Sequence, residues 1–206
     1  MKRTIIAISR EHGAHGTDIG KRLSERLGIP VYERKVIELA AEKSGLSADY
    51  IGSLEENSSR GFIFSLSAPG CSPVSMLPQY DVPVSFSAYS AQSAVIRELA
   101  AQGSSIIIGR CAEYILRDDP DVVPIFLRAD REDRVKYVMD ESGLDRKAAE
   151  QKLRQIDRGR ANYYRSYTGG EWGSANNHDL SINTSVSGVE GAVDIIVALL
   201  GAMGRI

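Results

Sequence analysis

The first thirty residues constrain the fold more than any other part of the chain, because a strand, a glycine-bearing loop and a helix follow one another there. Residues 4–8 are a continuous apolar run rich in β-branched side chains, which is typical of a strand buried on both faces of a parallel sheet. After the polar loop 9–16, apolar residues recur at helical spacing from Ile19 to Leu27, and Gly28 ends the helix. We expect this strand at the centre of the sheet.

The alternation of strands and helices continues along the chain. Further strands are expected over 31–32, 105–108, 122–127 and 180–183. Helices are expected over 34–44, 47–54, 87–102 and 130–142, from 145 through Ile156 to include Arg165, and as a short helix before residue 122. The segment Ser187 to Glu190 resembles a capping box before a last helix through Leu200. This pattern predicts an α/β fold, a parallel sheet of about five strands with right-handed crossovers, whose ligand lies at the carboxyl ends of the strands.

Length and composition narrow the class of protein further. The 206 residues fit one domain, and 43% hydrophobic with 25% charged residues excludes a disordered chain or a disulfide scaffold. The net charge of −2 gives no overall positive field for nucleic acid or an anionic membrane. Any anion site must therefore be local, and a nucleic-acid partner rests only on the arginines of residues 146–165.

The compartment is expected to be the cytoplasm. Cys71 and Cys111 are the only two cysteines, which is typical of reduced thiols. The N-terminal apolar run is too short for a signal peptide, and no stretch approaches the roughly 18 apolar residues of a membrane span. We therefore expect no membrane partner, and the oligomeric state stays open.

Residues 57–85 differ in composition from the rest of the chain. They mix serine, proline and glycine with scattered Phe62, Phe64 and Met76, and they show no periodicity. A stretch of this length inside a compact domain is uncommon unless it is a lid or a binding loop. We expect a mobile flap or an acceptor-binding insert.

The loop 9–16 is the best candidate for a ligand site. A glycine-bearing turn between a buried strand and a helix points backbone N–H groups and the positive end of the helix at one place, where a phosphate can bind. The alternative is a plain tight turn that needs glycine for its backbone. No lysine lies between Ser9 and Ile19, so the strict G-x-x-x-x-G-K-[ST] pattern is absent.

Residues 5–28 resemble the strand, loop and helix of bacterial cytidylate kinase, matching without a gap through the run K-R-L-x-E-x-L-G. In that register Arg10 stands at the first glycine of the loop, Gly13 matches a glycine and His15 replaces the last one. Gly16 replaces the lysine, and Thr17 follows. The chain resembles the divergent cytidylate kinase-like family, which keeps the loop length, the S-R start and the glycines without the standard lysine.

Three further segments resemble the same family. Gly109-Arg110 is similar to the start of its G-R-D motif, whose arginine contacts the acceptor, although Cys111 replaces the aspartate. Arg154-x-x-Asp157-x-x-Arg160 resembles its arginine-bearing lid, and residues 179–185 resemble its D-A-x-x-I-D-T-S ending. The resemblance implies one P-loop kinase-like domain over residues 1–206, a three-layer α/β sheet with a helical lid over 145–178.

The resemblance also implies an activity: ATP-dependent phosphoryl transfer, with Mg²⁺, to a nucleoside monophosphate or a similar small acceptor. The alternative is a nucleotide-binding regulatory protein that keeps the fold without transfer. The candidate phosphate-binding residues are Arg10, Gly13, Ala14, His15, Gly16, Thr17 and Lys21, with Thr17 also the candidate ligand of Mg²⁺. The candidate catalytic residues are Glu33, Arg154, Arg158 and Arg160, and the candidate acceptor-binding residues are Arg34 and Arg110.

Several of these residues have a second interpretation. The arginines of the lid can equally form a solvated face balanced by acidic neighbours, and Glu33 can simply favour the N-terminus of the next helix. The aromatic residues from Tyr163 to Trp172 can stack a base, but packing of the lid helix is favoured. His12, His15 and His178 lack further ligands at zinc spacing, and a cysteine nucleophile is equally disfavoured.

Overall fold

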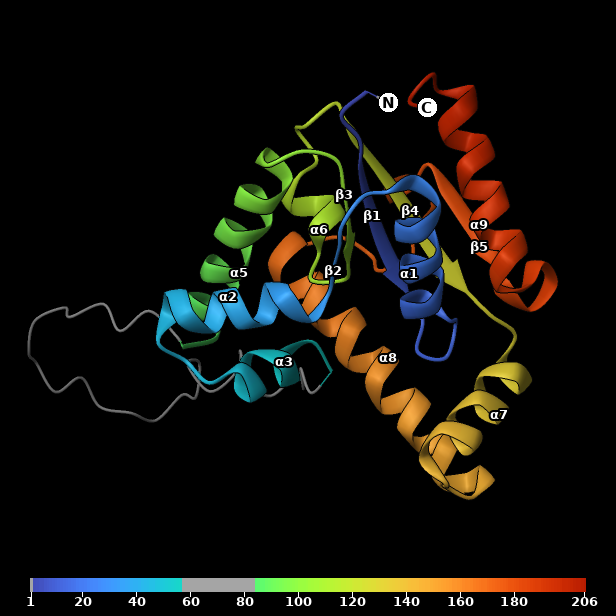
Figure 1. Ribbon diagram of the computed structural model, residues 1–206. Helices are drawn as coiled ribbons and strands as arrows, with labels where there is room; N and C mark the ends of the chain where they lie inside the picture. Colours follow the sequence, from blue (N-terminus) through green and yellow to red (C-terminus); the bar gives the residue numbers. More distant parts are fainter. Residues whose placement is uncertain (1, 57–83) are drawn as a thin grey trace, which may run out of the picture.

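The computed structural model describes residues 2–56 and 84–206, and these form a parallel sheet between two layers of helices (Figure 1). The sheet has the order β2-β3-β1-β4-β5, and every neighbouring pair of strands is parallel. The strands are β1 (Ile5–Arg10), β2 (Val31–Tyr32), β3 (Ser105–Ile108), β4 (Val122–Arg128) and β5 (Leu180–Asn183). The five-stranded parallel sheet and the central place of the first strand confirm the prediction.

The helices fall where the apolar periodicity placed them, apart from two starting points. They are α1 (Gly16–Leu27), α2 (Arg34–Ser44), α3 (Ala48–Glu56), α5 (Val84–Ala101), α6 (Ala112–Ile115), α7 (Arg131–Ser142), α8 (Arg146–Thr168) and α9 (Thr184–Ala202). Helix α5 starts before the expected Ser87, so residues 84 and 85 are helical and do not belong to a flap. The remainder of the expected flap, residues 57–83, lies outside the described residues.

The start of α9 corrects a second expectation. The helix begins at Thr184 after Asn183, whose side chain accepts a hydrogen bond from the Ser185 N–H at 3.1 Å. The backbone breaks at Gly188, with φ 65° and ψ −178°, so two helical pieces follow one another within these bounds. The longer piece begins after Gly188, where the capping box over 187–190 places the start of the last helix. The first turn, from Thr184 to Ser187, was not expected.

Two separate apolar cores cover the two faces of the sheet. The side chains of β1 alternate between them: Ile5 and Ala7 pack toward α2, α3, α5, α6 and α8, whereas Ile6 and Ile8 pack toward α1 and α9. Every residue of β1 is buried. This two-sided burial is what a continuous β-branched run requires, and it makes β1 the rigid support of the loop that follows it.

Helix α9 differs from the expectation that no segment could cross a membrane. Its residues Thr184–Ala202 are long and apolar enough for a span by length and composition, and it is the one such helix in the described ranges. Core helices of globular proteins pass the same test, and Val193, Ile196 and Leu200 of α9 are buried against the sheet. The feature is therefore weak evidence for a membrane segment.

The helical pair α7 and α8 extends away from the sheet on the side where the β1–α1 loop lies (Figure 1). A small apolar cluster of Val135, Val138, Ala149 and Leu153 holds the two helices together. The C-terminal part of α8 packs in the main core through Tyr163 and Tyr164. The lid region expected over 145–178 thus consists mainly of one helix anchored at its C-terminal end.

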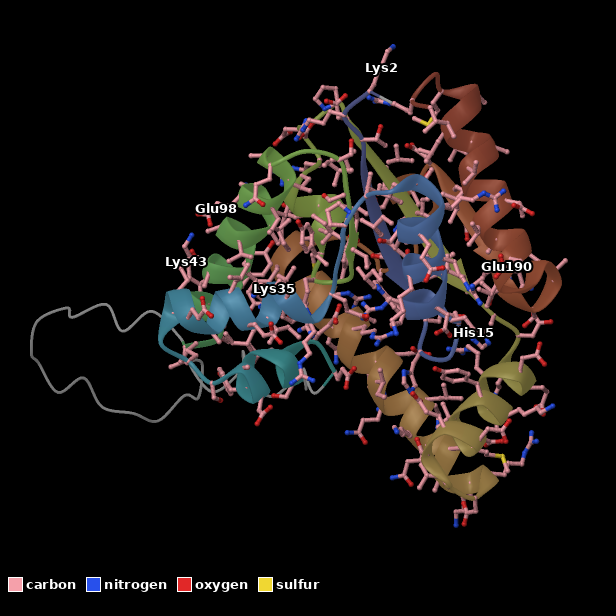
Figure 2. All side chains as sticks on the ribbon, in the orientation of Figure 1. Lys2, His15, Lys35, Lys43, Glu98 and Glu190 are labelled. Carbon is pink, nitrogen blue, oxygen red and sulfur yellow. The ribbon has the colours of Figure 1, made fainter. Side chains whose placement is uncertain are left out.

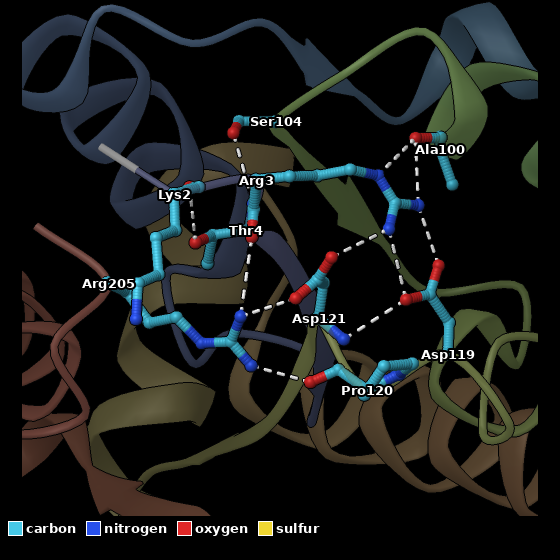
Figure 3. Close-up of polar contacts among 9 residues, drawn as sticks. All are labelled: Lys2, Arg3, Thr4, Ala100, Ser104, Asp119, Pro120, Asp121 and Arg205. Carbon is cyan, nitrogen blue, oxygen red and sulfur yellow. Dashed lines mark hydrogen bonds and ion pairs between the residues drawn. The ribbon is translucent and has the colours of Figure 1, made fainter.

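The two ends of the chain meet at the end of the sheet away from the β1–α1 loop (Figure 1), and ion pairs connect the segments there (Figure 3). Arg3 donates to Asp119 at 2.6 Å and to Asp121 at 3.0 Å, and Arg205 also donates to Asp121. The Lys2 N–H donates to the Arg205 carbonyl at 3.0 Å. Hydrogen bonds from Arg3 and Arg205 lower the pKa of Asp119 and Asp121.

Replacing Arg3 by alanine should lower the melting temperature at neutral pH, because two aspartates lose a partner. Both aspartates have folded-state pKa values below the ordinary 3.8, so their stabilisation is present above that pH and is lost as the pH falls through the folded pKa. The difference in melting temperature between Arg3→Ala and the unaltered protein should therefore shrink under acid. Arg22→Ala, at an exposed pair with Glu190, is the control that should change little; a difference independent of pH would contradict the assignment.

Candidate functional site

A cleft of about 530 Å³ opens at the carboxyl end of the sheet, where the fold predicts a ligand. It lies between the β1–α1 loop, the helices α2 and α3, and the pair α7 and α8. Its lining residues include Arg10, Glu11, His12, Gly13, His15, Gly16, Thr17, Asp18, Glu33, Arg34, Glu38, Asp49, Glu56, Arg110, Tyr137 and Arg160. Most candidate residues from the sequence therefore meet in one place.

The loop ends at the N-terminus of α1, where backbone donors are left over. His15, the residue before the helix, has a left-handed backbone with φ 56°, and its side chain makes no capping hydrogen bond. The N–H groups of the first turn, from Gly16 to Asp18, have no partner within the helix. Because these residues line the cleft, the donors and the positive helix end offer a site for an anion. The His15 side chain, labelled in Figure 2, lies 3.3 Å from Asp18 and forms a T-shaped ring pair with Tyr137.

Side chains from the helical pair fix the backbone of the loop at His12. Asp157 accepts from the His12 N–H at 2.9 Å, and Arg134 donates to the His12 carbonyl at 3.4 Å. Arg134 and Asp157 are themselves an ion pair at 2.6 Å, and Glu11 lies 3.5 Å from Arg134. Burial and the nearby Arg160 lower the pKa of His12 to about 4, so this imidazole is neutral at physiological pH. The conformation of the loop is therefore stabilised by Arg134 of α7 and Asp157 of α8, which the sequence motif does not include.

Arg10 is the last residue of β1, and its side chain lies against Gly16 and Gly109. Its guanidinium is buried between two carboxylates, with Nη2 3.1 Å from Glu33 Oε1 and Nη1 3.4 Å from Glu55 Oε1. A side chain at Gly16 would place its Cβ 2.8 Å from Arg10 Cγ, and one at Gly109 would lie 2.0 Å from Arg10 Nη1. Glycine is required at both positions because Arg10 fills the space.

Arg110 is buried, and within the described part of the chain its polar contacts are with α3. It donates to the carbonyls of Ile51 and Gly52 at 3.2 and 3.3 Å, and its Nε lies 3.5 Å from Glu55 Oε2. Despite burial, the arginines Arg110 and Arg10 lower the pKa of Glu55 to about 2. The predicted acceptor-binding arginine therefore lines the cleft while holding α3 in place. Its contact with an acceptor stays a prediction.

Cys111, which replaces the aspartate of the G-R-D motif, is a buried free thiol. Burial raises its pKa well above the ordinary value, so the thiol is protonated at neutral pH. Close by, Ser9 donates to the buried Glu113 at 2.9 Å, and burial raises the pKa of Glu113 to about 7. Neither Cys111 nor Glu113 lines the cleft.

Thr17 and Glu33 meet at the entrance of the cleft. The Thr17 hydroxyl donates to Glu33 Oε2 at 3.0 Å while Arg10 holds the other oxygen of the same carboxylate. Hydroxyl and carboxylate oxygens are ligands that suit Mg²⁺, which completes its shell with water and phosphate oxygens. Within residues 2–56 and 84–206 no cluster of three or more His, Cys, Asp or Glu could hold a metal ion unaided. The donors present thus fit a metal that arrives with a nucleotide.

The three candidate arginines of α8 are placed differently. Arg160 is buried, lines the cleft, and donates to the Arg10 carbonyl at 3.0 Å. Burial and the neighbouring Arg10 lower the pKa of Arg160 to about 10, which still leaves it charged. Arg154 is exposed and pairs with Glu150 at 3.6 Å, and Arg158 is also exposed. Neither of these two lines the cleft, nor do the candidates Ala14 and Lys21.

The cleft wall formed by α2 and α3 is rich in carboxylates. Glu38, Asp49 and Glu56 line it together with Arg34, which is exposed and pairs with Glu38 at 3.3 Å. Glu56 lies 3.5 Å from Arg160. This half of the cleft can accept hydrogen bonds from hydroxyl or amino groups of a small molecule.

The aromatic residues of α8 pack in the core, as favoured from the sequence. Tyr163 and Tyr164 are buried, and Tyr167 stacks on Tyr89 with ring centroids 4.0 Å apart. Trp172 contacts the edge of Phe126. Among the described residues, Tyr137 of α7 is the tyrosine that lines the cleft, and no motif or spacing in the sequence singled it out.

The family model described as "Cytidylate kinase-like family" matches residues 5–186. No curated protein matches the chain. Among solved structures, an uncharacterized protein from Eubacterium ventriosum ATCC 27560 is 25% identical with a TM-score of 0.71, and the match covers 97% of this chain and 99% of that one.

Two more distant structures share the fold. A shikimate kinase from Bacteroides thetaiotaomicron is 13% identical with a TM-score of 0.57, over 97% of this chain and 99% of that chain. A gluconokinase from Sinorhizobium meliloti 1021 is 11% identical with a TM-score of 0.54, over 98% of this chain and 95% of that chain. At this identity the likeness establishes the P-loop kinase fold alone.

Glu55→Gln should destabilise the protein by about 3–5 kcal/mol, the cost of leaving buried charges without their partner. The buried guanidinium groups of Arg10 and Arg110 would then lose a carboxylate. Since the folded pKa of Glu55 is about 2, its stabilisation is present above the ordinary 4.5 and is lost as the pH falls toward 2. Urea unfolding at pH 7 measures the change.

Glu56→Gln is the matched control for this measurement. It changes the next residue of α3, whose side chain is 44% exposed, and it should cost far less. Equal losses of unfolding free energy in the two variants would contradict a special role for the buried carboxylate.

Proposed function

Because the chain belongs to the cytidylate kinase-like family, we propose that it transfers the terminal phosphoryl group of ATP to a small acceptor. The observation that carries this proposal is the meeting of a helix N-terminus, the Thr17 hydroxyl and three buried arginines in one cleft. Phosphoryl transfer needs such donors and cations around the phosphates. The buried free thiol of Cys111 is in keeping with a reducing cytoplasm as the compartment.

The nucleotide would bind at the β1–α1 loop. Its β- and γ-phosphates would accept hydrogen bonds from the N–H groups of the first turn of α1, where the helix dipole favours negative charge. Arg160, held at the loop by the Arg10 carbonyl, adds positive charge on the side of α8. Thr17 would hold Mg²⁺ together with phosphate oxygens, and the ion would neutralise charge on the transferring group.

The acceptor would bind against α2 and α3, facing the loop across Glu33. A nucleoside monophosphate or a similar small molecule is proposed, with Arg34 and Arg110 as candidate contacts for it. The carboxylates Glu38 and Asp49 on this wall suit an acceptor that also carries hydroxyl or amino groups. A substrate panel should therefore contain nucleoside monophosphates together with sugars and other polyhydroxyl compounds.

The transfer itself would be an in-line displacement. An oxygen of the acceptor forms a bond to the γ-phosphorus, the bond from that phosphorus to the β–γ bridging oxygen breaks, and ADP leaves. If the attacking oxygen is a hydroxyl, its proton passes to Glu33, which stands between Thr17 and Arg10. Arginine side chains stabilise the charge on the equatorial oxygens. A transition-state role for the exposed Arg154 and Arg158 stays a prediction.

Purified protein with ATP and Mg²⁺ should form ADP and a phosphorylated product with one member of that panel, above a heat-killed control. Where the acceptor attacks through a hydroxyl, Glu33→Gln should lower kcat by about 10²–10⁴, because a carboxamide cannot accept the proton, while ATP binding survives. Glu42→Gln, an exposed change on the same helix α2, is the control that should leave kcat unchanged.

The outcome that contradicts transfer is ATP binding without product from any acceptor. That result would favour the alternative, a nucleotide-binding regulatory protein on the same fold. Retention of full kcat in Glu33→Gln would instead keep the enzyme and remove Glu33 from the proton transfer.

A further inference from the structure

The loop of this protein has its charged residue at the wrong position for a standard phosphate-binding loop. In the G-x-x-x-x-G-K-[ST] pattern the lysine reaches the β- and γ-phosphates. The corresponding positions here are Arg10, His15, Gly16 and Thr17, so a glycine stands where the lysine belongs and an arginine stands where the first glycine belongs. The two departures are at opposite ends of the same loop.

The arginine at position 10 and the glycine at position 16 depend on each other in the structure. A Cβ atom at position 16 would lie 2.8 Å from Arg10 Cγ, closer than real Cβ atoms come to a neighbour, and 3.2 Å from Arg10 Cβ, which is a tight contact. These are the atoms nearest the Arg10 backbone, so a rotation of the guanidinium end cannot relieve the contact. The stem of Arg10 therefore occupies the space through which a side chain at position 16 would leave the backbone.

The charge of the surrounding network also points to an anionic ligand. Arg10, Arg110 and Arg160 are buried around one buried carboxylate, Glu55. Arg10 also pairs with Glu33, and Arg160 with Glu56, whose side chains are 31% and 44% exposed. These two carboxylates line the cleft, so phosphate oxygens can replace them as partners of the buried guanidinium groups.

We propose that Arg10 supplies, from the first position of the loop, the cation that a lysine at position 16 supplies in a standard loop. This inference rests on the proposed function only in taking a nucleoside triphosphate as the ligand. In the complex a phosphate oxygen replaces Glu33 Oε1 as the partner of Arg10 Nη2. Glu55 keeps its contact with Nη1 and holds the guanidinium in place.

Arg10→Gln tests the charge while keeping most of the side-chain stem. Its affinity for ATP with Mg²⁺, and for inorganic tripolyphosphate as a probe without a base, should fall about tenfold or more in calorimetry. Arg26→Gln, at an exposed arginine on α1 that pairs with Asp194, is the control and should bind both probes normally. Unchanged affinity in Arg10→Gln would overturn the proposal.

A pair of double variants tests the exchange of positions directly. Arg10→Gly/Gly16→Lys removes the obstructing stem and restores a lysine at position 16, whereas Arg10→Gly/Gly16→Ala removes the stem and restores no charge. The lysine variant should bind tripolyphosphate about tenfold more tightly than the alanine variant. Equal affinities in two variants with native circular dichroism would overturn the proposal that a cation at position 10 and a cation at position 16 serve the same ligand.

The outcomes for this inference and for the proposed function are separable. Binding that depends on Arg10 without transfer to any acceptor would defeat the proposed function and leave the inference standing. Transfer by an Arg10→Gln protein with unchanged ATP affinity would do the reverse. The single variant Gly16→Lys, in which the stem of Arg10 remains, should bind tripolyphosphate more weakly than the unaltered protein, and normal binding would count against the steric argument.

Discussion

The arrangement of the site depends on the burial of arginine side chains beside the carboxylate of Glu55. A buried charge is tolerated only with close partners, so each guanidinium fixes the segment from which its partner comes. Arg10 comes from β1, Arg110 from the turn after β3 and Arg160 from α8, while Glu55 comes from α3. The central strand β1, the turn after β3 and the helices α3 and α8 are thereby held together beside the loop.

Most of the fold could be predicted because its signals are local. Continuous β-branched runs mark the buried strands, and glycines such as Gly28, Gly45 and Gly143 end helices in the left-handed conformation that they favour. The failures have local causes too. Helix α5 begins among serine and valine residues without an apolar stripe. The first turn of α9 lies before the break at Gly188, and it is too short to show a helical pattern in the sequence.

The site was less predictable because its side chains meet across the fold. The loop itself followed from its neighbours in sequence, whereas Glu55 and Arg134 come from distant helices. Helical spacing does indicate which of these charged residues share a face with apolar neighbours. In α8, Arg154 and Arg158 are four residues apart and share one exposed face, whereas Arg160 shares the buried face with Leu153 and Ile156. Glu55 likewise follows the buried Ile51 by four residues in α3, an acidic residue on an apolar face.

Glu33 joins the two halves of the cleft. One of its oxygens accepts from Arg10 and the other from Thr17, so Glu33 touches both the arginine and the hydroxyl that we propose for the triphosphate and its metal. Binding of a triphosphate with Mg²⁺ would draw both of these partners toward phosphate oxygens. A carboxylate released from two donors becomes a better acceptor for the proton of an attacking hydroxyl. A cation at position 10 would be bound to Glu33 until the nucleotide arrives, whereas a cation at position 16 need not be. The proposed position of the cation would therefore couple nucleotide binding to activation of the acceptor.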